Sequence, residues 1–229
     1  MVSKDIIERF KVIASASVSD ACEKVCGCRR YMDYEMQPRI SGSERLVGPA
    51  VTVQEGPANG EDCGPTHAFE AMDACEEAGS VMVISMANSD KDVALWGGIM
   101  TAGAVANNFA GAILDGGLRD VEEIRKGQAE GGLYGGRKFE IFSRSISANT
   151  TLGKYKTYAN NVPVMCGGIM VAPDDLIVAD CSGVVAIPKD SIEEVLKVCE
   201  EIEATELLEA QLIIEQGSIK AGLDKFNRV

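Results

Sequence analysis

Residues 80–87 form a continuous apolar run, SVMVISMA, directly after a glycine. A short run of this kind is typical of a β-strand buried on both faces, as in a parallel sheet covered by helices. The run therefore needs a layer of structure on each side. It predicts an α/β fold, in which strands alternate with helices in packed layers.

Strand-like and helix-like segments alternate along the rest of the chain. Apolar, β-branched runs predict strands at 46–54, 111–114, 139–142, 162–171 and 177–188. Apolar spacing predicts helices within residues 3–28 and at 66–78, 95–109 and 120–126. Ser19 or Asp20 is expected to cap a second short helix in the first of these segments. Because no repeat or linker divides the chain, we predict one α/β catalytic domain over residues 1–190.

The C-terminal residues predict one long acidic helix over 191–216, with Ser191 as its N-cap and Gly217 as its stop. An apolar stripe runs along it, formed by Ile192, Val195, Leu196, Cys199, Ile202, Leu207, Leu208, Leu212 and Ile213. Such a stripe must be buried, either on the domain or on a neighbouring subunit. Residues 191–229 are therefore predicted to be a helical extension of the same domain.

The charge balance argues against a nucleic-acid partner. The chain has 22 Lys and Arg residues against 35 Asp and Glu residues, a net charge of −13, whereas phosphate contacts require a basic face. No apolar run approaches the roughly 20 residues of a membrane helix. The N-terminal segment mixes charge into its apolar positions and lacks the core of a signal peptide. We expect no membrane partner and a cytoplasmic location.

Cysteine and histidine usage narrows the possible metal sites. The eight cysteines are expected to be reduced and buried, and Cys22, Cys26 and Cys28 lack the paired C-x-x-C of a zinc knuckle. The single histidine, His67, excludes a His-rich zinc site within one chain. The polar, glycine-rich stretch around it favours a loop position.

Several familiar cofactor motifs are missing from the sequence. No two glycines are separated by a single residue, which counts against Rossmann dinucleotide binding and S-adenosylmethionine binding. The P-loop and the G-x-S-x-G elbow are also absent. What remains are carboxylates, a well-placed arginine and glycine-rich turns, which suit an oxygen-ligated divalent metal.

Two stretches carry the candidate site. Residues 95–100, LWGGIM, form a glycine turn that enters a helix, and the amides at a helix start bind carboxylate or phosphate. Arg119-Asp120-x-x-Glu123 follows a strand; the arginine offers a fork for a carboxylate, and the two acids, at i and i+3, could hold one hard cation. The alternative is structural: acids favour the first helical turn, and an Arg–Asp pair is often only a surface ion pair.

The spacing Gly98-x20-Arg119-Asp120-x2-Glu123 resembles the signature of the RraA-like family, which includes the class II 4-hydroxy-4-methyl-2-oxoglutarate aldolases. The stretches at 18–21, 48–53, 80–84, 114–120 and 167–188 also fit the family pattern, so the resemblance covers roughly residues 12–188. It implies a compact αββα layered sandwich that assembles as a homotrimer or hexamer, with active sites between neighbouring subunits.

The resemblance also implies a chemistry that uses Mg²⁺ or Mn²⁺ and a small 2-oxo acid substrate. Arg119 would neutralise the substrate carboxylate and the oxygen that becomes an enolate, and Asp120 would bind the metal directly or through water. The aldolase pattern has an aspartate near the metal at the position of Gly98. In this chain Glu123 would take the place of that missing acid. The carboxylate itself would be held by the helix-start amides of Gly97, Gly98, Ile99 and Met100.

These parts predict a lyase that cleaves the C3–C4 bond of a 2-oxo diacid through a pyruvate enolate. It would act as a 4-hydroxy-4-methyl-2-oxoglutarate aldolase, an oxaloacetate decarboxylase, or both. The alternative is a non-catalytic regulator that binds an RNA-degrading endonuclease, the activity from which the family takes its name. The Arg119-Asp120-x-x-Glu123 motif favours the enzyme, because a pure binding protein has no need of it. The missing glycine turn disfavours a methyltransferase.

Overall fold

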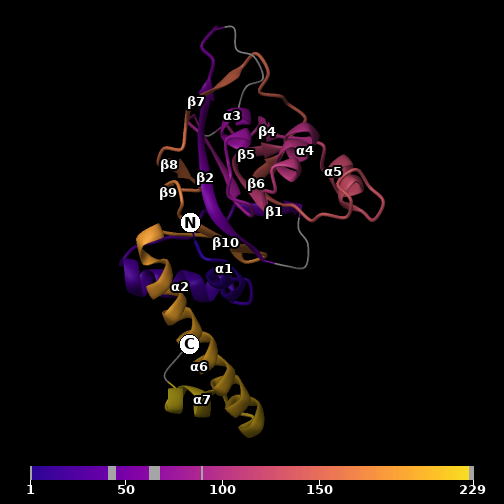
Figure 1. Ribbon diagram of the computed structural model, residues 1–229. Helices are drawn as coiled ribbons and strands as arrows, with labels where there is room; N and C mark the ends of the chain where they lie inside the picture. The colour runs from indigo at the N-terminus through magenta and orange to yellow at the C-terminus, as the bar shows by residue number, and fades with distance from the viewer. Residues whose placement is uncertain (1, 41–44, 62–67, 89, 227–229) are drawn as a thin grey trace.

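The computed structural model describes residues 2–40, 45–61, 68–88 and 90–226 and forms a mixed α/β structure (Figure 1). Four parallel strands make the centre of the main sheet. In spatial order they are β6, β5, β3 and β2, spanning Glu140–Ile146, Gly111–Leu118, Val81–Met86 and Leu46–Pro57. The short strand β4, Ala94–Trp96, pairs in parallel with the end of β5. The predicted α/β class is confirmed.

Antiparallel strands extend this parallel centre on both sides. β1 (Gln37–Ile40) pairs with β6 at one edge. β10 (Leu176–Asp180) pairs with the first part of β2, and β7 (Tyr155–Asn160) pairs with its last part. β11 (Gly183–Ile187) follows β10 in a hairpin, so the single strand predicted over 177–188 is two strands. The long strand β2 therefore joins the parallel centre to two antiparallel segments.

Strand β3 is buried along its whole length, as its apolar sequence predicts. Met82 and Ile84 lie in a core that also contains residues of three helices, which cover one face of the sheet. These helices are α3 (Phe69–Asp73), α4 (Gly98–Ala106) and α5 (Val121–Gln128). Because strand side chains alternate between faces, the neighbouring valines of β3 must be covered separately.

A small hairpin covers the opposite face of β3. Val81 and Val83 pack in a second core with residues of β8 (Val164–Cys166) and β9 (Ile169–Val171). The prediction of one strand over 162–171 is wrong. The glycines at 167 and 168 both have positive φ angles, 58° and 81°, which suit the two-residue turn of a hairpin.

A third core lies between the β10–β11 hairpin and the terminal helices α1 (Lys4–Phe10), α2 (Ser15–Cys26) and α6 (Ile192–Gln216). The first half of α6 is buried there through Ile192, Val195, Leu196, Cys199 and Ile202. Its second half extends away from the sheet, with α7 (Ile219–Phe226) beside it (Figure 1). The long predicted helix is confirmed, whereas the division at residue 190 stays a prediction.

Several helix boundaries differ from those predicted. Helix α2 begins at Ser15 after Ala14, so Ser19 and Asp20 lie within it and cap nothing. Ser191 occupies the N-cap position of α6 without a capping hydrogen bond, while Gly217, with a φ of 61°, ends that helix as predicted. Of the helix predicted over 66–78, residues 69–73 form α3, and His67 lies outside the described residues.

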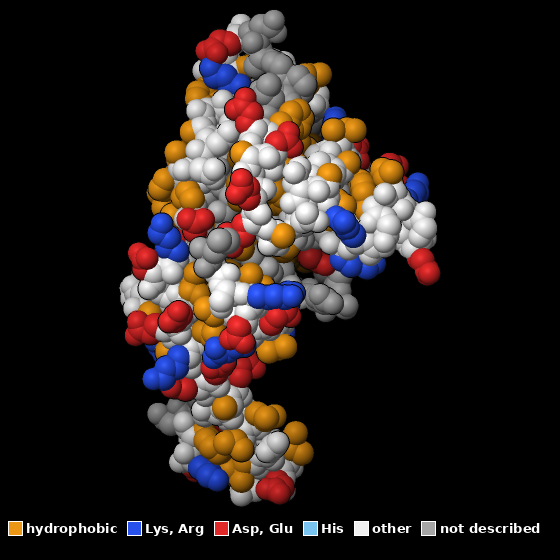
Figure 2. Space-filling view, in the orientation of Figure 1, with side chains coloured by type: hydrophobic (Ala, Val, Ile, Leu, Met, Phe, Trp, Pro, Cys, Tyr) orange, Lys and Arg blue, Asp and Glu red, His pale blue; other side chains and the backbone are white. Residues whose placement is uncertain are grey.

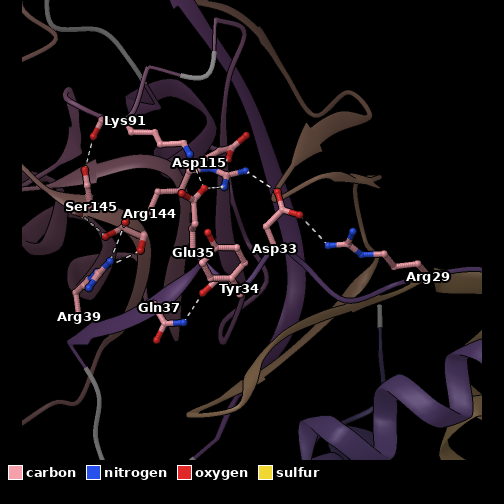
Figure 3. A network of polar contacts seen from close by, with 11 residues as sticks. Arg29, Asp33, Tyr34, Glu35, Gln37, Arg39, Lys91, Asp115, Arg144 and Ser145 are labelled. Carbon is pink, nitrogen blue, oxygen red and sulfur yellow. Dashed lines mark hydrogen bonds and ion pairs between the residues drawn. The ribbon is translucent and has the colours of Figure 1, made fainter.

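A polar network ties the segment before β1 to the parallel strands (Figure 3). Arg144 of β6 has a side chain that is only 8% exposed, and it donates to Asp115 of β5, to Glu35 at 2.8 Å and to Asp33 at 3.2 Å. Burial raises the pKa of Asp115, although the Arg144 guanidinium opposes that shift. The network therefore anchors β5 at Asp115, near the end of the strand that leads into the candidate site.

The cysteines that the structure describes are all free thiols. Cys22, Cys166 and Cys199 are buried, as predicted, and burial raises the pKa of all three, in Cys199 to about 12. Cys28 and Cys181 are exposed, contrary to the prediction. Among the helices of the described residues, none combines the length and apolar character needed to cross a membrane. The cytoplasmic location stays a prediction.

Candidate active site

Two chain segments that are 22 residues apart meet at one end of the sheet. Strand β4 leads through Gly97 into α4, and β5 leads through Arg119 and Asp120 into α5. Parallel pairing of β4 with the end of β5 brings them together, and the Arg119 amide donates to the carbonyl of Trp96 at 3.0 Å. The predicted helix over 95–109 begins only at Gly98, because the preceding residues join the sheet. Both predicted halves of the site are thus adjacent.

Asp120 occupies the N-cap position of α5 in a left-handed conformation, with a φ of 58°. Aspartate is one of the few residues with a side chain that adopts this conformation readily. Its carboxylate does not cap α5; instead, Oδ2 accepts a hydrogen bond from the Gly98 amide at 2.9 Å. Arg119 Nε lies 3.6 Å from the same oxygen. Asp120 Oδ1 makes no hydrogen bond to any residue that the structure describes, so it remains available to a ligand.

The two glycines of the turn have different roles. A Cβ atom added at Gly97 would lie 2.7 Å from Asp120 Oδ2 and 3.0 Å from Arg119 Nε, closer than ordinary contact. A Cβ added at Gly98 would lie 3.6 Å from Asp120 Oδ2, which is ordinary van der Waals contact. A glycine is therefore required at position 97 so that the side chains of Arg119 and Asp120 can lie this close to the turn. Position 98 does not require a glycine for this reason.

The first turn of α4 presents backbone amides toward the site. The Gly98 amide is occupied by Asp120, and the Thr101 amide donates to the Gly97 carbonyl at 3.0 Å. The amides of Ile99 and Met100 have no hydrogen-bond partner within the described part of the chain. Free amides at a helix N-terminus, with the positive end of the helix dipole, favour an anion. Of the amides predicted to hold a carboxylate, that of Gly98 is thus occupied, whereas those of Ile99 and Met100 remain free for that role.

A series of buried contacts holds the glycine turn at 97–98 in place. Trp96 stacks on Phe139, with ring centroids 5.8 Å apart, and its Nε1 donates to Thr101 Oγ1 at 2.9 Å. The Thr101 hydroxyl in turn donates to the Gly97 carbonyl at 3.1 Å. All three side chains are buried, so the peptide after Gly97 has little freedom to rotate. Nothing in the residue spacing indicates this arrangement.

A cavity of about 380 Å³ opens beside Arg119. Its described lining includes Phe69, the residues of β4, the start of α4 and a segment at 150–152. Among those lining residues, Arg119 is the only charged one. Its side chain is 43% exposed, and its terminal guanidinium nitrogens have no hydrogen-bond partner among the described residues. The arginine is therefore free to meet an anionic group in the cavity.

The donor set near Asp120 suits a hard cation that retains water. Mg²⁺ keeps several of its waters and binds proteins through one or two carboxylates together with substrate oxygens. Asp120 supplies one such carboxylate, with Oδ1 free of described partners. Glu123 lies in the first turn of α5 as predicted, but its side chain is 66% exposed and pairs with Lys126 at 3.9 Å. The described residues contain no group of three or more metal-binding side chains. A metal at Asp120 and Glu123 stays a prediction.

Tyr134 is a site residue that the sequence did not indicate. Its hydroxyl donates to the Gly98 carbonyl at 3.3 Å, and its ring packs where a Cβ at Gly127 would come within 2.4 Å of it. Burial raises the pKa of Tyr134, and the charge of Asp120 adds to that shift. The hydroxyl supports the glycine turn through its hydrogen bond to Gly98. A tyrosine between two glycine pairs, GGLYGG, is the only signal in the sequence.

Comparison with known proteins connects this geometry to a family. The model of the RraA-like family, described as Aldolase/RraA, matches residues 15–186. A Halalkalibacterium halodurans protein, provisionally named 4-hydroxy-4-methyl-2-oxoglutarate aldolase, is 31% identical over 227 residues, covering 96% of this chain and 95% of that protein. Protein DlpA of Legionella pneumophila is 31% identical over 194 residues, 84% of this chain, but the chain spans only 29% of DlpA.

A solved structure has the same fold. It is RraAS2 of Streptomyces coelicolor, described as an unusual member of the RNase ES inhibitor RraA protein family. The TM-score is 0.75 at 21% sequence identity, and the match covers 90% of this chain and 96% of that one.

Proposed function

Because the chain belongs to the RraA-like family, we propose that it is a divalent-metal-dependent lyase that releases pyruvate from a 2-oxo acid. The observation that carries the proposal is the position of Arg119, with free terminal nitrogens, beside Asp120 and two free helix-start amides. A positive charge and hydrogen-bond donors stabilise the developing charge of an enolate, and an acid with a free oxygen can hold a divalent metal.

The substrate carboxylate would bind at the start of α4. The amides of Ile99 and Met100 would donate to it, and the helix dipole would favour its charge. Arg119 would reach the same end of the substrate from the cavity wall, where its planar guanidinium can contact two oxygens at once. This arrangement would place the 2-oxo group between Arg119 and Asp120.

The cation would be Mg²⁺ or Mn²⁺, held by Asp120 with support from Glu123, and when bound it would supply Lewis acidity at the 2-oxo group. Cleavage of the C3–C4 bond would leave its electron pair on the pyruvate fragment as an enolate, which is then protonated at C3. The C4 fragment would leave as CO₂ from oxaloacetate, or as a second pyruvate from 4-hydroxy-4-methyl-2-oxoglutarate, whose C4 hydroxyl gives up its proton to water as the carbonyl forms. Arg119 would oppose the negative charge as it grows on the enolate oxygen. Retro-aldol cleavage of 4-hydroxy-4-methyl-2-oxoglutarate and decarboxylation of oxaloacetate share this intermediate.

A pyruvate assay coupled to lactate dehydrogenase tests the proposal. Purified protein is given a panel of 2-oxo acids, including these two, with Mg²⁺, with Mn²⁺ and with a chelator. We expect pyruvate release that depends on the metal and stops with the chelator. Absence of release from every substrate, or release that the chelator leaves unchanged, contradicts the proposal.

We also propose that the protein assembles as a homotrimer or hexamer. The hairpin of α6 and α7 carries apolar side chains that are exposed in the single chain, and Figure 2 includes an apolar patch at this end of the molecule. These side chains are Leu207, Leu208, Ile214 and Ile219. Exposed apolar surface of this kind marks protein–protein contacts. Light scattering after size exclusion would give the mass, and a monomer contradicts the proposal.

The second candidate function is regulation of an RNA-degrading endonuclease. It draws support from the family of the Streptomyces protein and from the net charge of −13, which would suit a mimic of RNA. Replacement of Asp120 by Asn separates the two functions. Endonuclease inhibition that survives this substitution in a protein without lyase activity favours the regulator.

A further inference from the structure

The peptide unit that joins Gly97 to Gly98 is held at both ends. Its carbonyl, that of Gly97, accepts from the Thr101 amide at 3.0 Å and from Thr101 Oγ1 at 3.1 Å. Its N–H, that of Gly98, donates to Asp120 Oδ2 at 2.9 Å. Because a peptide is planar and trans, its C=O and N–H point in opposite directions. The contacts at the carbonyl therefore help to direct the N–H toward the acid.

The next peptide unit, from Gly98 to Ile99, is held at its carbonyl end. The Tyr134 hydroxyl donates to the Gly98 carbonyl at 3.3 Å. The Ile99 N–H, at the other end, belongs to the first turn of α4, where the helix itself supplies no acceptor. A hydrogen bond to the carbonyl limits rotation of the peptide and polarises it, which strengthens the N–H as a donor. Tyr134 thus acts on the same peptide whose N–H is proposed to hold the substrate carboxylate.

The ring of Tyr134 is held in place by contacts that do not involve its hydroxyl. The residue is 8% exposed, and its ring packs against α5 so closely that a Cβ at Gly127 would come within 2.4 Å of it. The Tyr134 amide donates to the Gly127 carbonyl at 2.8 Å. The residue is therefore anchored on α5, and its hydroxyl reaches across to α4. Removal of the hydroxyl alone should leave the ring where it is.

We infer that Tyr134 is a positioning residue for the substrate carboxylate. Its hydroxyl orients and polarises the Gly98–Ile99 peptide, so that the Ile99 N–H can donate to the carboxylate. The inference rests on the proposed function for the identity of the anion as a 2-oxo acid. Because Tyr134 acts on the peptide beyond the one that Asp120 binds, loss of its hydroxyl should weaken binding of the carboxylate and spare binding of the metal.

Calorimetric titration of pyruvate into the intact protein with saturating Mg²⁺ tests the inference without turnover. Tyr134→Phe removes only the hydroxyl. Tyr158→Phe is the matched control, because the Tyr158 hydroxyl also donates to a backbone carbonyl, that of Pro57 at 2.6 Å, and Tyr158 is outside the described cavity lining. We expect the Kd of pyruvate to rise about 5-fold in Tyr134→Phe, the size of one hydrogen bond, and to keep its wild-type value in Tyr158→Phe.

Three outcomes of these titrations overturn the inference. The first is equal pyruvate affinity in Tyr134→Phe and the wild type, which would leave the hydroxyl with a purely structural role. The second is no binding of pyruvate to the wild type. The third is a matching loss of Mn²⁺ affinity in Tyr134→Phe, because Tyr134 would then act through Asp120.

Nuclear magnetic resonance can observe the Ile99 amide directly. Glycine labelled with ¹³C at its carbonyl and isoleucine labelled with ¹⁵N select Gly–Ile peptides, and the chain has two, within the GGIM segments at 97–100 and 167–170. Saturating pyruvate should shift the Ile99 resonance in the wild type and shift it clearly less in Tyr134→Phe. Ile169, which lies in β9, should not respond in either protein. Equal shifts of Ile99 in the two proteins overturn the inference.

The outcomes also separate this inference from the lyase proposal. Weaker pyruvate binding by Tyr134→Phe, in a protein that catalyses no pyruvate release, supports the positioning role and contradicts the lyase. Metal-dependent pyruvate release, with equal pyruvate affinity in Tyr134→Phe and the wild type, supports the lyase and overturns the positioning role.

Discussion

The carboxylate of Asp120 accepts a hydrogen bond from the backbone amide of Gly98 at 2.9 Å, which joins the end of β5 to the start of α4. Asp120 stands at the N-cap of its own helix but serves the neighbouring helix instead. This contact holds the acid and the anion-binding turn in one arrangement. Because each half of the site positions the other, small changes at the contact should affect catalysis more than stability.

Gly97→Ala and Gly98→Ala form a matched pair that tests this contact. The new methyl at position 97 would press on Asp120 Oδ2 and Arg119 Nε, whereas the methyl at 98 meets only ordinary contact distances. A displacement of about 1 Å at reacting groups can reduce the rate about 10²-fold. We therefore expect a loss of that size in kcat/KM for pyruvate release in Gly97→Ala, and most of the activity to remain in Gly98→Ala.

The stability of the two alanine variants provides the control. The groups that must move in Gly97→Ala are partly exposed side chains, so the free energy of unfolding in urea should change little in either protein. Equal activities of the two variants would show that the close approach at Gly97 has no catalytic role.

Asp120→Asn should abolish binding of the metal while it preserves the fold. Asparagine also tolerates the left-handed backbone at this position, and its amide oxygen can still accept from Gly98. The negative charge that attracts a divalent cation is lost. Titration of Mn²⁺ followed by electron paramagnetic resonance should detect a bound ion in the wild type and none in the variant. Equal Mn²⁺ affinity in the two proteins would place the metal elsewhere.

The sequence predicted the regular elements best where burial alone determines them. The run at 80–87 needed only its apolar character, and it forms β3 in the centre of the sheet. Boundaries that depend on distant pairing were missed: the residues of β4 became a strand only because the end of β5 lies beside them. The start of α2 was missed because Ala14, at its N-cap, offers no side-chain signal.

The candidate site was predictable to the extent that it is local. The pattern around Arg119 and Asp120 follows from neighbouring residues and from the family resemblance. The contacts that support it are long-range; Tyr134 reaches Gly98 across 36 residues, and no periodicity indicates such a contact. The left-handed backbone of Asp120, which turns its carboxylate away from its own helix, was likewise beyond the reach of spacing rules.

Arg144→Met should destabilise the fold through Asp115. The substitution removes a nearly buried guanidinium and leaves the buried carboxylate of Asp115 without its charged partner. We expect the free energy of unfolding to fall by about 3–5 kcal/mol in urea titrations. The double variant Arg144→Met/Asp115→Asn should recover part of this loss, and a double variant that is less stable than Arg144→Met would contradict the account.

Asp180 should contribute stability that depends on pH. Burial alone would raise its pKa, but hydrogen bonds from Ser15 and Ser182 and the nearby Arg45 outweigh burial and hold the pKa below the ordinary value of 3.8. Because the pKa of Asp180 is lower in the folded state than in the unfolded state, its charged carboxylate stabilises the fold at pH values above the unfolded-state pKa. This contribution is lost as the pH falls through the folded-state pKa.

Asp180→Asn tests this contribution. Loss of the charged acceptor should lower the free energy of unfolding at pH 7 by about 1–3 kcal/mol. Chemical unfolding over roughly pH 2–5 should also give a shallower loss of stability with acid in the variant than in the wild type. Parallel pH profiles for the two proteins would exclude Asp180 as a source of acid sensitivity.

The most direct test of the central claim is pyruvate release from oxaloacetate by Arg119→Ala with saturating Mg²⁺. Arg125→Ala serves as the control, because Arg125 lies on α5 outside the cavity lining and donates to the carbonyl of Arg39. We predict that kcat falls about 10²-fold or more in Arg119→Ala, as it does when a donor to a developing oxyanion is lost, and stays near the wild-type value in Arg125→Ala. Near-normal turnover by Arg119→Ala would contradict the claim that this arginine stabilises a pyruvate enolate.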